Sequence, residues 1–223
     1  MHRVLASLLN TNRPDLAPSI ATIATEADKA IDEFRTNLYP RVVEIDRQIP
    51  GIGMQCAVWS KTTPHYPFPG QEFDGIVRPL RYVPYKLASR IPLQMISRSV
   101  VFDSGGHLEE CVKDFCRTMR LPERHYEHKP LGTCTNLIKS QLRDALAQDI
   151  LRFCSISWNQ AKHRYRDGLP KSVISVEDAI VSYFVARILG AKVLTESGRL
   201  DAVVKAVEDA RRKGEFYVTG ELP

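Results

Sequence analysis

The apolar residues of this chain recur mainly at the spacing of α-helices. Within residues 15–38 they stand three or four positions apart, which places them on one face of a helix. The same period returns in residues 105–120, 131–166, 176–194 and 198–213. The pattern therefore predicts a mainly α-helical protein built as a bundle of about five helices.

Local signals mark the ends of these helices. Ser175, followed three positions later by Asp178, has the form of a capping box at the start of the helix over 176–194. The segment 131–166 is longer than most helices of globular proteins. We expect either one long helix there or two helices separated by a kink near residues 154–157.

Residues 51–103 depart from the helical pattern. Seven of the fourteen prolines lie between residues 50 and 103, and short β-prone runs such as Cys56–Trp59 and Ser99–Phe102 stand between them. Because proline removes a backbone donor and disrupts helix interiors, we expect a long extended segment with short strands. Its place is between the first and the second helix.

These expectations give one domain in three parts. Residues 1–50 hold an N-terminal helix, residues 51–103 a Pro-rich arm, and residues 104–223 the helical bundle. A hydrophobic content of 43% is enough for a core and excludes a disordered chain. No apolar run approaches the roughly 20 residues that cross a bilayer, so we expect no membrane association and a cytoplasmic location.

The charge balance bears on the partner. The net charge is +5 and the isoelectric point is near 9.0. This excess favours an anionic partner such as RNA, DNA or a nucleotide, although a basic protein without such a partner has the same composition. The five cysteines are odd in number and include no C-x-x-C pair, which argues against a disulfide framework and against a zinc ribbon.

Side chains suited to chemistry converge in one stretch of the chain. Asn159, Lys162, His163 and Arg166 stand at i, i+3, i+4 and i+7, and share one face of a helix. A histidine transfers protons near neutral pH, and the two cations suit a phosphate. The competing interpretation is a polar helix end, where the dipole favours cations.

The same stretch resembles a known family. The string N-x-x-K-H-R at 159–164 is followed by a Gly/Pro loop and by S-V-E-D-A-I-x-x-Y-F at 175–184. This arrangement is similar to the second half of HEPN-type helical domains, and the resemblance covers about residues 105–194. It implies a helical bundle that forms a homodimer and needs no cofactor or metal. It also implies RNA cleavage to a 2′,3′-cyclic phosphate, with Asn159 and His163 as the site pair.

Many members of that family act in toxin–antitoxin and other defence systems, so an antitoxin protein is the partner that the resemblance implies. The family signature, an arginine separated from the histidine by four to six intervening residues, is absent here, because positions 156–158 hold no arginine. The string does occur at Arg120–His125, where Pro122 interrupts a predicted helix end. We therefore also consider a non-catalytic helical interaction protein.

A second candidate pair is His107 with Glu110, three residues apart on a predicted helix. In a bundle this pair can face His163 as a carboxylate–imidazole arrangement or as part of a metal site. No matching E-x-x-H motif accompanies it, so we assign no metal. The alternative is an ordinary first turn of a helix, where acidic residues favour the dipole.

Overall fold

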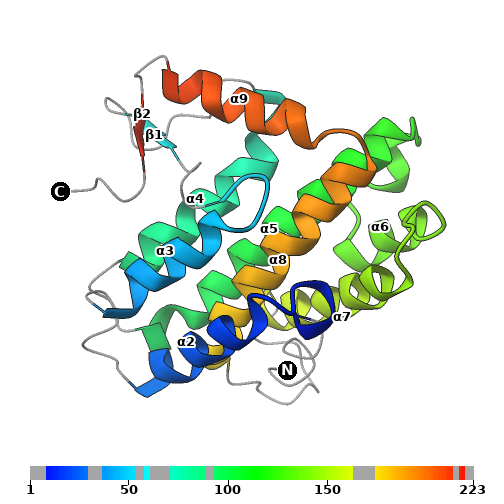
Figure 1. Ribbon diagram of the computed structural model, residues 1–223. Helices are drawn as coiled ribbons and strands as arrows, with labels where there is room; N and C mark the ends of the chain where they lie inside the picture. Colours follow the sequence, from blue (N-terminus) through cyan, green and yellow to red (C-terminus); the bar gives the residue numbers. More distant parts are fainter. Residues whose placement is uncertain are drawn as a thin grey trace.

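The protein is mainly α-helical, as the apolar pattern predicts. The computed structural model describes residues 9–29, 37–53, 58–60, 71–88, 93–162, 174–212 and 216–218. Residues 9–12 form a helical turn, and the longer α-helices are α2 (Ala17–Lys29), α3 (Tyr39–Arg47), α4 (Asp74–Ala88), α5 (Leu93–Thr118), α6 (Leu131–Ile138), α7 (Ala145–Lys162), α8 (Val176–Glu196) and α9 (Leu200–Arg212). This set exceeds the predicted five (Figure 1).

Short elements complete the described structure. The 3-10 turns are η3 (Gln71–Phe73) and η4 (Glu123–His125), and the strands are β1 (Val58–Ser60) and β2 (Phe216–Val218). The two strands pair antiparallel beside α9, so residues 58–60 lie next to residues 216–218. Within the described residues no helix combines the length and apolar character needed to cross a membrane.

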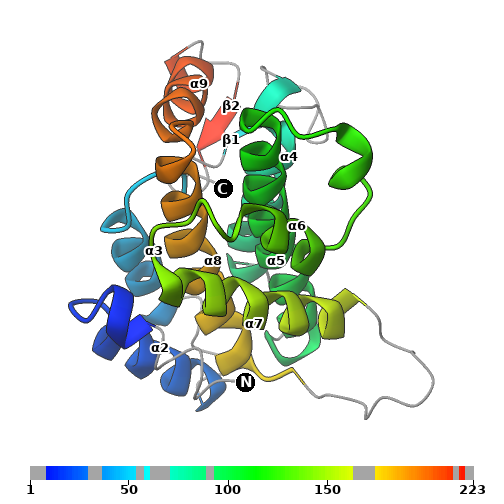
Figure 2. The ribbon, with the colours of Figure 1, turned by 90° about the vertical axis from the view of Figure 1, so that its right-hand side faces the viewer.

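Helices α5 and α8 form the centre of the molecule. They lie side by side, with α4 packed on α5, α2 packed on α8, and α7 crossing the pair on another side (Figures 1 and 2). α8 takes this place because its apolar residues surround the whole helix, which is typical of a buried one. The predicted capping box is present: Ser175 Oγ accepts from the Asp178 N–H, and Asp178 accepts from the Ser175 N–H.

Two glycines allow the central helices to approach closely. A Cβ atom on Gly190 of α8 would lie 2.4 Å from Nε2 of His107 on α5. A Cβ atom on Gly105 of α5 would lie 2.3 Å from Cγ of Trp158 on α7. Both positions are therefore contact points at which any larger residue would force the helices apart.

The predicted Pro-rich extended arm is wrong for residues 71–88 and 93–103, which are helical. Pro79 and Pro84 stand inside α4. The helix tolerates them because a buried apolar stripe, spaced as in a helix, packs α4 against α5. This stripe consists of Ile76, Val77, Leu80, Val83 and Leu87. The other residues of the arm, apart from 51–53 and β1, lie outside the described part.

Two predicted helix boundaries also change. The helix expected over 105–120 begins at Leu93, so Gly105 is in the interior of a helix instead of at its start. The segment expected over 131–166 divides at residues 139–144, not near 154–157. The backbone N–H of Arg143 in this break donates to Glu196 Oε2 at 3.0 Å, which ties the break to the end of α8.

A buried ion pair joins α3 to α8. Arg187 and Asp46 are both fully buried, and Arg187 Nε lies 2.7 Å from Asp46 Oδ1. The Tyr183 hydroxyl donates to the same carboxylate oxygen at 2.7 Å, and Arg187 Nη2 donates to the Ile49 carbonyl at 3.1 Å. Each charge is therefore satisfied by several hydrogen bonds, which is the condition under which a buried ion pair is stable.

Replacing Arg187 by methionine should lower the free energy of unfolding by about 3–5 kcal/mol, because Asp46 would remain buried without its counter-charge. Urea unfolding of the purified protein measures the change. The control is Arg41→Met, which removes an exposed ion pair with Glu26 and should cost less than about 1 kcal/mol. Equal losses in the two variants would contradict the role given to the buried pair.

Candidate functional site

The last turn of α7 carries two of the predicted site residues. Asn159 is half-buried and Lys162 is exposed, and both belong to the helix, which ends at Lys162. His163 and Arg166 lie outside the described residues. Of the predicted constellation the structure thus describes Asn159 and Lys162, which lie about one turn apart on α7.

An arginine from another helix caps this end. Arg98 of α5 donates from Nε to the Ala161 carbonyl and from Nη2 to the Gln160 carbonyl, both at 2.7 Å. These two charge-assisted hydrogen bonds hold the last described turn of α7 against α5. The sequence does not predict this role of Arg98, because Arg98 and Ala161 are 63 residues apart in the chain and no local motif indicates that they meet.

Lys162 rests on an aromatic side chain. Its Nζ lies 4.8 Å from the ring centroid of Trp158, which is itself buried. Among the described residues Lys162 makes no ion pair or hydrogen bond. Burial raises the pKa of the Glu109 carboxyl, and Lys113 and Lys162 lower it in smaller part. The ammonium group is thus held in place while it stays accessible to an anion.

The second predicted pair separates into two different surroundings. His107 is fully buried between α4, α5 and α8; its Nδ1 lies 2.9 Å from the Ile76 carbonyl and its Nε2 faces Gly190. This distance assigns the ring proton to Nδ1, which donates to the carbonyl. Burial lowers the pKa of His107 to about 4, so the ring is neutral at physiological pH. His107 is therefore part of the core.

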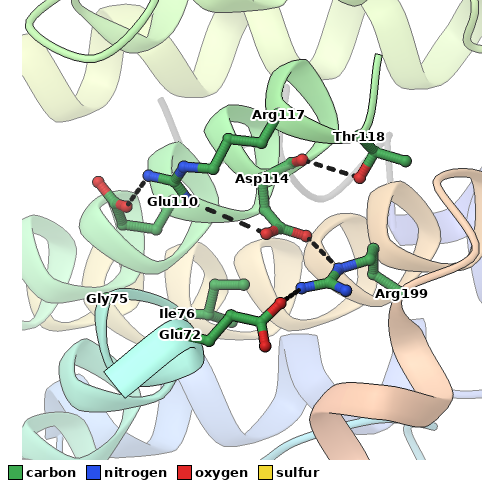
Figure 3. A pocket seen from close by; sticks show the side chains of 8 residues that line it. All are labelled: Glu72, Gly75, Ile76, Glu110, Asp114, Arg117, Thr118 and Arg199. Atoms are coloured by element: carbon green, nitrogen blue, oxygen red, sulfur yellow. Dashed lines mark hydrogen bonds and ion pairs between the residues drawn. The ribbon is translucent and has the colours of Figure 1, made fainter. Parts of the chain in front are cut away.

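Glu110 instead lines a surface cleft of about 560 Å³ formed by η3, the start of α4, α5 and Arg199 directly before α9 (Figure 3). Arg199 Nε lies 3.1 Å from Asp114 Oδ2, and Arg117 Nη1 lies 3.8 Å from Asp114 Oδ1. Arg199 also pairs with Glu72, and Arg117 Nη2 lies 3.6 Å from Glu110 Oε2. The cations of this cleft are thus neutralised by its own carboxylates, and the network ties α9 and η3 to α5.

The string Arg120–His125 does not form a helical motif. α5 ends at Thr118, Arg120 has a positive φ of 55°, and His125 ends the short 3-10 turn η4. The string therefore does not place Arg120 and His125 on one helix. Among the described residues no group of three His, Cys, Asp or Glu side chains is arranged to hold a metal ion.

Comparison with known proteins adds no relative. Neither a family model, nor a curated protein, nor a solved structure matches this chain. The case for a function therefore depends on the side chains of this chain alone. Arg98, Asn159 and Lys162 come together at the end of α7.

Arg98→Ala should loosen the last turn of α7, because two carbonyls lose their charged donor. We expect faster hydrogen exchange for the amides of residues 158–162 and a loss of about 1–2 kcal/mol in the free energy of unfolding. Arg152→Ala is the matched control, since Arg152 is an exposed arginine on the same helix and should change stability by less than about 0.5 kcal/mol. Unchanged exchange in Arg98→Ala would contradict the capping role.

The buried His107 should make stability fall as the pH drops. Its pKa is about 4 in the folded protein and near 6.5 in an unfolded chain, so between these values the unfolded state binds the proton. Relative to His107→Asn, the native protein should lose about 3 kcal/mol between about pH 7 and about pH 4. Titratable groups that both proteins contain change the free energy of unfolding equally, so their contributions cancel in this difference. Urea unfolding across that range measures it, and parallel curves would contradict it.

Proposed function

We propose that the protein is a HEPN-like, metal-independent ribonuclease or RNA-binding protein of a defence or toxin–antitoxin system. The observation that carries the proposal is the convergence of Arg98, Asn159 and Lys162 at the end of α7. The segment that follows carries His163 and Arg166. The net charge of +5 also favours an RNA partner.

The chemistry needs few groups, because RNA supplies its own nucleophile. His163 would act as the general base that takes the proton of a 2′-hydroxyl, or as the acid that returns a proton to the leaving 5′-oxygen. The hydroxyl oxygen attacks the adjacent phosphorus and the bond to the 5′-oxygen breaks, which leaves a 2′,3′-cyclic phosphate. Asn159 would orient the imidazole, and Lys162 with Arg166 would stabilise the phosphate charge.

A helix C-terminus normally disfavours a phosphate, because its free carbonyls carry partial negative charge. Arg98 changes this balance at the end of α7. Its guanidinium occupies the carbonyls of Gln160 and Ala161 and adds a positive charge beside Lys162. The helix end is thereby compatible with an anionic ligand. Arg98 is a positioning residue in this proposal, since two of its donors are engaged by the helix.

A second candidate function is supported by a separate observation. Met95, Phe102 and Ile156 are large apolar residues with exposed fractions of 77%, 41% and 51%, and they lie on α5 and α7. Where exposed apolar groups gather into a patch, they are typical of protein interfaces. A non-catalytic helical interaction protein, whether a homodimer or the partner of an antitoxin, would use such a surface.

Cleavage of a labelled single-stranded RNA by the purified protein in the presence of EDTA tests the proposal. His163→Ala should lower the rate at least about a hundredfold, because general acid–base catalysis is lost. The products of the native protein should end in 2′,3′-cyclic phosphates. Equal activity of the native protein and His163→Ala would remove the catalytic claim and favour the interaction protein.

Lys162→Ala should weaken RNA binding and reduce the slope of log affinity against log salt by about one, as expected for one lost phosphate contact. The matched control is Lys205→Ala, which removes an exposed lysine of α9. If both variants bind RNA equally well, Lys162 is not a phosphate contact.

A further inference from the structure

We propose that Phe102 stacks on an unpaired nucleobase next to the phosphate held by Lys162. This inference rests on the proposed RNA function and adds to it a residue that contacts the base of the bound nucleotide. The sequence pattern did not single out Phe102, because residues 99–102 were expected to form a strand instead of the exposed face of a helix.

Three side chains form a continuous row across α5 and α7. The ring centroids of Phe102 and Trp158 are 6.3 Å apart with planes tilted by 43°, and Lys162 Nζ lies 4.8 Å from the Trp158 ring. Trp158 is buried, whereas Phe102 is 41% exposed. Phe102 is therefore the member of the row with aromatic surface available to a ligand.

The surroundings of Phe102 distinguish a nucleic acid from an apolar protein partner. Arg98 stands one turn before it on α5, and Lys162 and the half-buried Asn159 stand at the adjoining end of α7. An apolar partner would have to cover these polar and cationic groups. A nucleotide matches both features at once, since its base has an apolar flat face and its phosphate is negative.

Stacking on Phe102 requires a base that is not stacked in a duplex. Sequence-independent recognition of single strands combines a basic track with aromatic rings in this way. In double-stranded RNA the bases are paired and stacked within the helix, and proteins contact phosphates and 2′-hydroxyls instead. Phe102 should therefore contribute to binding of single strands and add little to binding of duplexes.

The test measures fluorescence anisotropy of 2′-O-methylated oligoribonucleotides, which the native protein cannot cleave because the nucleophile is blocked. Phe102→Leu keeps the apolar bulk without the ring, and should weaken binding of an oligoadenylate about tenfold. It should leave binding of an abasic strand of equal length and charge unchanged. Phe102→Trp should restore binding of the oligoadenylate. Met95→Ala is the matched control, as it removes another exposed apolar side chain of α5.

Each other result overturns the inference. Equal binding of the oligoadenylate by the native protein and Phe102→Leu would exclude stacking, and an equal loss on the abasic strand would show a structural effect. Unchanged RNA binding together with loss of self-association in sedimentation would assign Phe102 to a protein interface. If the native protein neither binds nor cleaves RNA, the proposed function fails as well; if it does and Phe102→Leu behaves identically, only the stacking role fails.

Discussion

The buried contact between Asp46 and Arg187 is the constraint on which the arrangement of the helices depends. Removing two charges from water is costly, and this cost is offset only where each charge keeps its hydrogen bonds. The Tyr183 hydroxyl and the Ile49 carbonyl supply them. Gly53 is part of the same arrangement, because a Cβ atom there would lie 2.3 Å from Asp46 Oδ2. α3 therefore has one favourable position on α8, and any shift would leave a buried charge unpaired.

Close contacts between helices connect α8 to the candidate site at the end of α7. Gly190 of α8 has no side chain and so leaves space for the ring of His107. The Nδ1 of His107 donates a hydrogen bond to the Ile76 carbonyl of α4. α5 then carries Gly105 against Trp158 and Arg98 against the end of α7. The position of the basic helix end is thus a consequence of packing at the molecular centre. A larger residue at Gly190 would displace the site from a distance, and one at Gly105 would push directly on Trp158.

The parts of the fold that could be predicted from sequence are those that depend on local signals. α8 begins at Val176 because the capping box and the apolar run agree. α4 is not predicted by the local signals, because Pro79 and Pro84 argue against a helix and only packing of its buried stripe against α5 makes the helix favourable. For the site, spacing along one helix grouped Asn159 with Lys162. The contribution of Arg98 depends on two helices meeting, and no local pattern encodes such a contact.

The two charged regions of the described structure differ in how their cations are held, and this difference bears on function. In the cleft, Arg117 and Arg199 are each fixed by carboxylates, so an added anion would have to displace partners already in place. At the end of α7, Lys162 is fixed by the face of Trp158 and Arg98 by helix carbonyls. These partners position a cation without supplying a full opposite charge. The charges of Lys162 and Arg98 are therefore not cancelled within these contacts, which favours recognition of a phosphate.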